Sequence, residues 1–240
     1  MSIVSIDTSS QVSSVAVLSG ERIAAEISMQ GALTHSETLM PHIETALHMA
    51  RVKKGELKGI AVSIGPGSFT GLRIGLATAK IMAYALHTPL VCVPTLEALA
   101  HHCICTGVRL IPMMDAQKGN AYAGLYEWRG DGLHEVRPVH VAPLAEAIAA
   151  AAAMGRQVLI TGELVQKKRD RLGDLPENVT LAPAHLLAAH ASHVARLGLS
   201  RLTSGESDDL MTLEPFYIRR SEAEVLWEKR HGREKGDAPC

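Results

Sequence analysis

The sequence is poor in aromatic side chains and in cysteine, and neither sign of charge predominates. Phe, Trp and Tyr together make up only 3% of the 240 residues, and the formal net charge is −1. A balance this close to neutral gives no electrostatic argument for a nucleic-acid-binding surface. The four cysteines are too unevenly spaced for a disulfide framework, so we expect reduced thiols.

Long hydrophobic runs are missing as well. No uncharged apolar run reaches the ~18 residues that a membrane-spanning helix requires. The N-terminal residues show neither the basic stretch nor the cleavage site of a signal peptide. With 47% hydrophobic and 20% charged residues, the composition is that of an ordinary globular protein. We therefore expect a cytoplasmic protein that makes no contact with a membrane.

What the first half does contain is an alternation of short apolar strands and amphipathic helices. Predicted strands span residues 2–7, 13–18, 23–29, 58–64 and 90–93. Predicted helices span residues 35–51, the apolar stretch that follows Ser68, and residues 95–105, where Thr95 is the expected N-cap.

The second half repeats this order of elements. Apolar strands end in an aspartate in both halves, at Asp7 and at Asp115, and a polar turn and a second strand follow each one. Further elements are predicted over residues 135–141, 143–154, 157–161 and 185–199. The repetition predicts two α/β lobes in tandem.

We place the first lobe at residues 1–107 and the second at residues 108–217. A helix over residues 221–230, with Ser221 as its N-cap, is expected to pack back on the first lobe. Residues 231–240 are charged and contain Gly and Pro, which predicts a disordered tail.

The most informative segment is the glycine-rich turn between the strand that ends at Ile64 and the helix after it. It reads Gly65-Pro66-Gly67-Ser68-Phe69-Thr70-Gly71, which matches neither a P-loop nor Gly-x-Gly-x-x-Gly. Amides at the N-terminus of the helix could bind an anion, or Ser68 could simply cap the helix. Candidate anion or nucleotide contacts are Asp7, Thr8, Ser9, Gly67, Ser68 and Asp115. Alternatively, Asp7 and Asp115 only order the turns that follow them.

The helix after this turn has a ridge without large side chains. Gly71, Gly75, Ala79 and Ala83 recur at every fourth residue and therefore lie on one face. Two glycines inside a helix cost up to about 1 kcal/mol each relative to alanine, so a close backbone approach is a plausible reason for them. The helix is either a central core helix or one that receives a second chain.

Two histidine-containing groups resemble metal sites. His101-His102-Cys103-x-Cys105 has no second arm of ligands, and His185, His190 and His193 fit a polar stripe on an amphipathic helix. We interpret both groups as structural, and we expect neither a metal ion nor a cofactor.

Four segments together resemble the TsaB family, also called YeaZ, of bacterial tRNA threonylcarbamoyladenosine synthesis. They are Ile-Asp-Thr-Ser at 6–9, His-Ser-Glu-x-Leu-Met-Pro at 35–41, the glycine-turn segment at 65–75, and Pro-Phe-Tyr-Ile-Arg at 215–219. The resemblance spans nearly the whole chain. It implies a duplicated actin-like, ribonuclease-H-like fold of the ASKHA type. It also implies two partners, TsaD, which performs the transfer, and the ATPase TsaE.

The sequence departs from the catalytic relatives of this family. The two histidines of the TsaD metal motif, aligned from the glycine turn, fall on Thr95 and Leu99, and leucine has no donor atom. Asp7 is followed by Thr-Ser-Ser and Asp115 by Ala-Gln-Lys, where actin-like ATPases have glycine-rich turns. The expected adenosine-binding pair reads Thr161-Gly162-Glu163.

These departures favour a non-catalytic partner subunit in threonylcarbamoyl transfer to the adenosine beside the tRNA anticodon. The alternatives are a stand-alone actin-like ATPase or kinase and a glycoprotease-like metallopeptidase. We expect a heterodimer with TsaD, a homodimer in its absence, and only indirect contact with tRNA. The predicted partner interface comprises His35, Leu39, His42, Ile43, Leu72, Arg73, Gly75, Leu76, Ala79 and Lys80.

Overall fold

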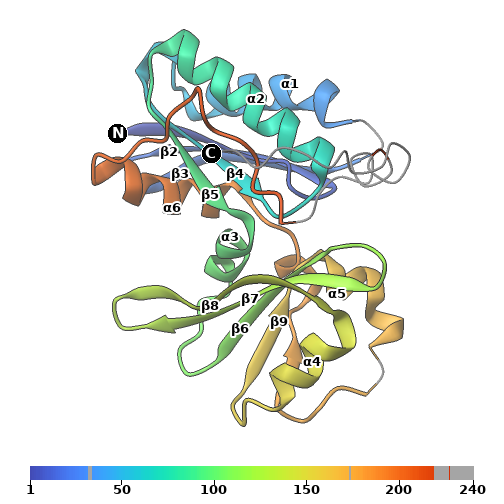
Figure 1. The fold of residues 1–240 in the computed structure, drawn as a ribbon. Coiled ribbons are helices and arrows are strands. Elements are labelled where there is room, and N and C mark those ends of the chain that lie inside the picture. Colours follow the sequence, from blue (N-terminus) through green and yellow to red (C-terminus); the bar gives the residue numbers. More distant parts are fainter. Residues whose placement is uncertain (32–33, 173, 219–226, 228–240) are drawn as a thin grey trace, which may run out of the picture.

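The computed structural model describes residues 1–31, 34–172, 174–218 and 227. Its two lobes lie one above the other in Figure 1, and each is built on a five-stranded sheet. The order is β3-β2-β1-β4-β5 in the first sheet and, read from the other edge, β8-β7-β6-β9-β10 in the second. This shared order confirms the predicted duplicated α/β fold.

The first sheet comprises β1 (Ser2–Asp7), β2 (Val12–Ser19), β3 (Arg22–Gln30), β4 (Leu57–Gly65) and β5 (Leu90–Pro94). Strands β1, β2 and β3 pair antiparallel, whereas β1, β4 and β5 pair parallel. The central strand β1 is buried along almost its whole length, as expected for a strand covered on both faces.

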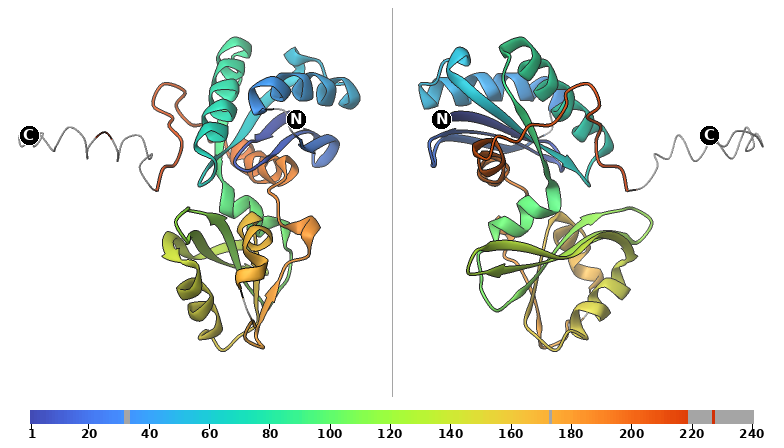
Figure 2. Two further views of the ribbon diagram at one scale, coloured as in Figure 1. Left: turned by 90° about the vertical axis from the view of Figure 1, so that its right-hand side faces the viewer. Right: turned by 60° about the vertical axis from the view of Figure 1, so that its left-hand side comes forward.

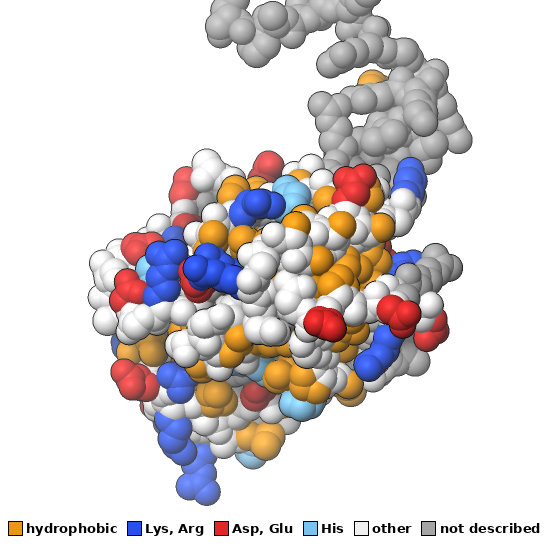
Figure 3. Space-filling model, turned by 90° about the horizontal axis from the view of Figure 1, so that it is seen from below, with side chains coloured by type: hydrophobic (Ala, Val, Ile, Leu, Met, Phe, Trp, Pro, Cys, Tyr) orange, Lys and Arg blue, Asp and Glu red, His pale blue; other side chains and the backbone are white. Residues whose placement is uncertain are grey.

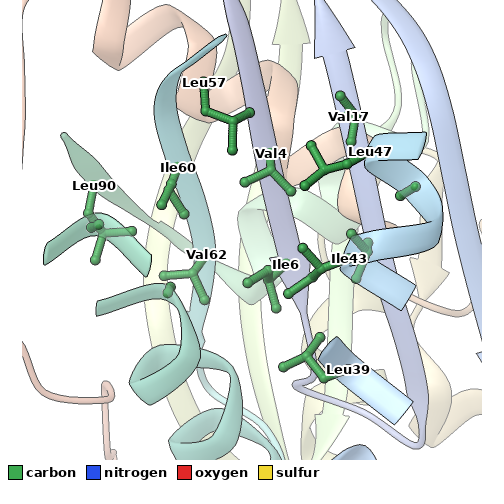
Figure 4. Close-up of a cluster of buried hydrophobic side chains, with 14 of the residues drawn as sticks. Val4, Ile6, Val17, Leu39, Ile43, Leu47, Leu57, Ile60, Val62 and Leu90 are labelled. Carbon is green, nitrogen blue, oxygen red and sulfur yellow. The ribbon is translucent and has the colours of Figure 1, made fainter. Parts of the chain in front are cut away.

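Helices α1 (His35–Ala50) and α2 (Phe69–Leu86) cover one face of this sheet, and α6 (Ala191–Thr203) covers the other (Figures 1 and 2). Helix α1 begins at Thr34, whose backbone amide donates to Glu37 Oε2 at 2.9 Å. Figure 4 shows the core between the sheet and these two helices, with Val4 and Ile6 of β1 at its centre. The sequence pattern predicted α1 to within one residue at either end and the start of α2 directly after Ser68.

The second lobe begins after α3 (Thr95–His102), which connects the two sheets. Its strands are β6 (Arg109–Asp115), β7 (Asn120–Arg129), β8 (Gly132–Pro143), β9 (Val158–Thr161) and β10 (Val179–Leu181). Helices α4 (Leu144–Ala152) and α5 (Glu163–Lys168) pack on one face of this sheet. Three short 3-10 turns complete the fold, at Lys54–Glu56, Arg169–Arg171 and Ala184–Leu186. No helix in the described part of the chain is both long and apolar enough to cross a membrane.

The prediction of a helix over residues 185–199 in the second lobe was wrong. His190 is extended (φ −112°, ψ 138°), and α6 runs from Ala191 to Thr203 against β1, β4 and β5 of the first sheet. Gly198 allows this packing, since a Cβ there would overlap Ala61. An apolar helix face predicts burial but does not say which sheet it covers.

Residues 204–218 also belong to the first lobe, so the second lobe ends near residue 190 rather than at residue 217. We call this segment the strap, and it lies alongside β5. The Asp208 amide donates to Leu90 O at 2.8 Å, and Asp208 Oδ2 accepts from the Cys92 amide at 2.6 Å. Arg201 of α6 holds Asp208 in place with a hydrogen bond of 3.0 Å to Oδ1. The predicted helix at 221–230, apart from Trp227, and the predicted tail at 231–240 lie outside the described residues.

Candidate functional site

The predicted site begins where β1 ends. Asp7 is fully buried, and its Oδ1 accepts from the Ser9 amide at 3.0 Å and from Ser9 Oγ at 2.8 Å. Burial raises the pKa of the Asp7 carboxyl, and the hydrogen bonds from Ser9 oppose that rise. Asp7 therefore orders the turn after β1, which is the structural one of the two roles weighed for it.

The glycine-rich turn packs directly against this strand end. The Ser68 amide donates to Ser9 O at 2.7 Å, and a Cβ at Gly67 would overlap Ser9 O. Ser68 Oγ accepts from the Gly71 amide at 3.2 Å, which confirms it as the N-cap of α2. The chain's own strand end therefore fills the concave side of the turn, where a phosphate-binding loop would leave room.

The glycine ridge of α2 has the same neighbour. Thr8 Oγ1 donates to Gly71 O at 2.8 Å, and a Cβ at Gly71 or at Gly75 would overlap Thr8. The close backbone approach that the sequence indicated is real, but the partner is β1 of the same lobe. The first alternative, a helix packed inside its own fold, describes this ridge.

The equivalent turn of the second lobe is organised in the same way. Asp115 Oδ1 accepts from the Gln117 amide at 2.8 Å, and Gln117 and Lys118 both have positive φ values, +61° and +53°. Asp115, like Asp7, orders the turn that follows its strand. This similarity extends the internal repeat to the level of single hydrogen bonds.

A cleft of about 620 Å³ separates the two lobes at this level. Three of the six candidate anion contacts, Gly67, Ser68 and Asp115, line it; Asp7, Thr8 and Ser9 are fully buried beneath the turn. Lys167 in the cleft pairs with Glu163 at 3.1 Å, which offsets its charge. The cleft has the size of a ligand pocket, but it lacks an open glycine cradle. The other lining residues are Ser10, Gln11, His35, Pro66, Phe69, Thr70, Leu72, Met114, Ala116, Gln117, Tyr122, Phe216, Tyr217 and Ile218.

The first four residues of the Pro-Phe-Tyr-Ile-Arg motif, 215–218, end the strap, and Phe216, Tyr217 and Ile218 line this cleft. The Phe216 amide donates to Ile64 O at 2.8 Å, and Arg73 Nε donates to Tyr217 Oη at 2.8 Å. The guanidinium carbon of Arg73 lies 3.9 Å from the centroid of the Phe69 ring, which adds a cation–π contact. Arg73, predicted as an interface residue, thus also fastens the strap to α2.

Six of the ten predicted interface residues are internal. Leu39, Ile43, Leu72, Gly75, Leu76 and Ala79 are all buried within the first lobe. The prediction that these six side chains meet a partner was wrong, because a helix that is apolar on most sides does not reveal which side faces its own sheet.

The polar members of the predicted set lie nearer the surface. His35 and His42 contact Ser10 O at 2.9 Å and Ser13 Oγ at 3.4 Å, respectively. Lys80 Nζ donates to Leu213 O of the strap at 3.0 Å. His35, His42 and Lys80 are half-buried, while Arg73 is exposed.

The outer surfaces of α1 and α2 expose hydrophobic side chains that the predicted interface did not include. Ile81 is 69% exposed and Tyr84 is 74% exposed on α2, and Met40 is 44% exposed on α1. Ala77 is exposed one turn before Ile81. We call these four residues the α1–α2 outer face; the two helices lie side by side in Figures 1 and 2. The signal was present in the sequence, since α2 has more apolar residues than one face can bury.

The positions aligned with the TsaD metal motif hold no ligands. The prediction that Thr95 is the N-cap of α3 was wrong, because Pro94 is the N-cap and Thr95 is the first residue of the helix. The Thr95 side chain has another role, since its Oγ1 accepts from the Gly65 amide at 3.1 Å. Leu99 lies in the core between α3 and the second sheet. Within the described ranges, no three His, Cys, Asp or Glu side chains are placed so that they could hold a metal ion.

A second cavity, of about 510 Å³, lies in the second lobe between α4 and the segment that starts with α5. Figure 3 shows hydrophobic side chains gathered on the face seen from below, where this lobe lies. None of the residues that the sequence singled out lines this cavity. Its lining consists of Gly119, Asn120, Leu144, Ala145, Ile148, Ala149, Leu164, Lys168, Leu172, Asp174 and Pro176.

Comparisons with known proteins give consistent matches. Residues 29–227 match the family model described as TsaD, tRNA N6-adenosine threonylcarbamoyltransferase. The tRNA threonylcarbamoyladenosine biosynthesis protein TsaB of Bacillus subtilis (strain 168) is 31% identical over 228 residues, which covers 95% of this chain and 98% of that protein. The protein of the same name from Escherichia coli (strain K12) is 24% identical over 241 residues, 98% of this chain and 100% of that protein.

The solved structure of YeaZ from Pseudomonas aeruginosa has the same fold. It superposes with a TM-score of 0.74 at 26% identity and covers 90% of this chain and 99% of its own. This likeness agrees with the duplicated α/β architecture that the sequence predicted.

Proposed function

The chain belongs to the TsaB (YeaZ) family, and from this membership we propose that it is a non-catalytic subunit that supports threonylcarbamoyl transfer by TsaD, with TsaE, to the adenosine beside the tRNA anticodon. Its role in tRNA threonylcarbamoyladenosine biosynthesis follows from the relatives named TsaB. The division of labour among the subunits is our proposal, and it rests on the chemistry of the residues described above.

The observation that supports it most is the filled glycine turn. Nucleotide phosphates are held by backbone amides in an open, glycine-lined concavity. Here Ser9 and Thr8 occupy that space and hydrogen-bond the turn and the helix. Thr95 and Leu99 are both buried and offer no metal site. A protein with neither feature is better suited to positioning another subunit than to performing the transfer.

The α1–α2 outer face is the surface that we assign to TsaD. Exposed Ile81, Tyr84 and Met40 are hydrophobic side chains on two adjacent helices. Exposed apolar side chains are typical of protein–protein contacts, and tyrosine is enriched among the residues that dominate their affinity. The match of this chain to the TsaD family model suggests that TsaD has a comparable helix pair. In its absence, a second copy of this chain would cover the same face in an isologous dimer.

We predict that the isolated protein transfers no threonylcarbamoyl group to tRNA and hydrolyses no peptide. The physical reason is the absence of ligands at Thr95 and Leu99, which leaves no place for a metal ion to polarise a carbonyl group. The measurement is product formation by the purified chain, together with its metal content. Stoichiometric tightly bound zinc or iron, with an activity that a chelator abolishes, would contradict the proposal.

The cleft between the lobes favours one alternative, a stand-alone actin-like ATPase or kinase. Its volume of about 620 Å³ would accommodate a nucleotide. Because the turns at Ser9 and Gln117 are closed by their own hydrogen bonds, we predict no measurable binding of ATP with magnesium in an isothermal titration of the isolated chain. Saturable binding with a dissociation constant below about 10 μM, which corresponds to a binding free energy of about 7 kcal/mol, would favour the ATPase.

A further inference from the structure

Four histidine rings meet between the end of α3 and the start of α6. His101 Nδ1 and His193 Nδ1 lie 2.9 Å apart, so the two nitrogens share one hydrogen. The centroid of the His102 ring is 4.4 Å from that of His193 and 5.0 Å from that of His190. All four side chains are half-buried. Each ring therefore touches at least one other ring, across the two helices.

This cluster lies where the chain crosses between the lobes. Helix α3 leads from β5 of the first sheet to β6 of the second and lies between the lobes in Figure 1. The chain returns through the residues just before α6, which begins at Ala191 on the first sheet. Trp128 of β7 packs against His101 with ring centroids 5.3 Å apart. The histidine contacts thus join both crossing segments and reach the second lobe.

In this packing, the histidine rings can bind few additional protons. A second proton on the His101–His193 pair would place two N–H groups face to face at 2.9 Å. His102 Nδ1 is buried and has no hydrogen-bond partner within the described ranges. Burial lowers the pKa of His101, of His102 and of His193, and for His193 to about 3. Neighbouring histidine rings add to the effect on His102 and His193, and the charge of Arg196 adds to it on His101.

His190 behaves in the opposite way. Its Nδ1 lies 3.7 Å from Glu26 Oε1 and 3.3 Å from Ser28 Oγ, both on β3. The nearby carboxylate of Glu26 raises the pKa of His190. His190 therefore stays attached to the first lobe when it takes up a proton. The other charged or titratable groups that face the cluster are Asp7 of β1, His185 before α6, and Arg196 of α6.

We propose that these four histidines form an acid-sensitive latch between the two segments that cross from lobe to lobe, which holds the lobes together at neutral pH and lets them reorient below about pH 6. His101, His102 and His193 stay neutral when the latch is closed and can take up protons when it opens. The stability that these three neutral rings give to the closed form is complete above the ordinary pKa of histidine and is lost as the pH falls below it. Each proton taken up on opening shifts the ratio of open to closed forms about tenfold per pH unit. The latch would change the width of the cleft, a property separate from the subunit role proposed above.

The test compares the wild-type protein with the double variant His101→Gln/His193→Gln, whose amides do not titrate. Small-angle X-ray scattering at about pH 8 and about pH 5.5, on either side of the ordinary histidine pKa, reports the arrangement of the lobes. We expect the radius of gyration of the wild type to increase at the lower pH, with its circular dichroism unchanged. The double variant should change its radius much less between the two pH values, because only His102 of the three rings remains to take up a proton. The control His48→Gln, an exposed histidine of α1, should respond as the wild type does.

Three results would overturn the latch: an unchanged wild-type radius, an equal response in the double variant, or a loss of helix signal that shows acid unfolding instead. Stoichiometric zinc uptake at neutral pH, lost in the double variant, would identify a metal site and would also overturn it. If the double variant does not fold, His193→Gln alone should show a shallower dependence on pH, by about one proton. If His193→Gln alone shows the same dependence of its radius on pH as the wild type, the proposal is wrong.

Discussion

The double variant Ile81→Asp/Tyr84→Asp is expected to fold normally and to lose its partner. Both side chains are mostly exposed, so the carboxylates stay in water in the isolated chain and cost little stability. At an interface, the same change removes two hydrophobic anchors and buries two charges. Truncating one such anchor commonly costs about 2 kcal/mol, which weakens binding about 30-fold. We expect the dissociation constant for TsaD to rise by at least that factor.

Self-association is expected to weaken in the same variant, because one face serves both contacts. Sedimentation velocity of the isolated chain should show a dimer for the wild type and a monomer for the variant. The matched control is Ile104→Asp, since Ile104 is 73% exposed but follows α3, away from the α1–α2 outer face. If Ile81→Asp/Tyr84→Asp binds TsaD as tightly as Ile104→Asp does, the interface lies elsewhere.

Gly75→Leu is expected to damage the fold rather than the partner surface. Any side chain at this position would overlap Thr8, which is fully buried and hydrogen-bonded to Gly71 O. Overpacking of a core typically costs about 1–3 kcal/mol and occasionally more. For a chain of this size, 1 kcal/mol corresponds to about 2–4 °C in melting temperature. We therefore expect the melting temperature to fall by roughly 5–10 °C.

Ala77→Leu provides the control for this change. Ala77 lies on the same helix only two residues away but is exposed, so the added side chain meets solvent. Its melting temperature should stay within about 2 °C of the wild type, because exposed substitutions usually change stability by less than 0.5 kcal/mol. Equal melting temperatures for the two variants would mean that the α2 ridge does not pack on β1.

The core strands and the first two helices could be predicted from local pattern alone. Strand β1 is a continuous apolar run and α1 repeats its apolar residues with helical spacing, and each pattern has one physical solution. The two aspartates that end β1 and β6 also served as a reliable signal. Both proved to order their turns through the amide two residues later.

The contacts between distant segments could not be predicted in the same way. Helix α6 follows the second lobe in sequence, yet its small residues at Gly198 and Ala195 fit the first sheet. For α2, the sequence identified an approach of backbones but not its partner, which is Thr8, 63 residues before Gly71. The pattern of apolar residues on one helix indicates how much of the helix is buried. Which segment packs against the buried face depends on the fold of the whole chain.

The same limit explains the error in the predicted interface. Leu72 and Leu76 are as apolar as Ile81, and only the orientation of α2 on its sheet separates the buried side chains from the exposed one. The contact of Arg73 with Tyr217 was equally hidden, because it joins residues 144 positions apart. The histidine cluster was interpreted as two separate structural groups, because its members come from two helices that are far apart in the sequence.

A reconstituted modification assay tests the central claim most directly. Purified TsaD and TsaE with tRNA and substrates are incubated without this chain, with the wild type, and with Ile81→Asp/Tyr84→Asp, and the chain is also incubated alone. The account predicts modified tRNA only when the wild-type chain accompanies both partners, and at least a tenfold loss with the variant. Modification by this chain alone, or undiminished modification in its absence, would contradict it.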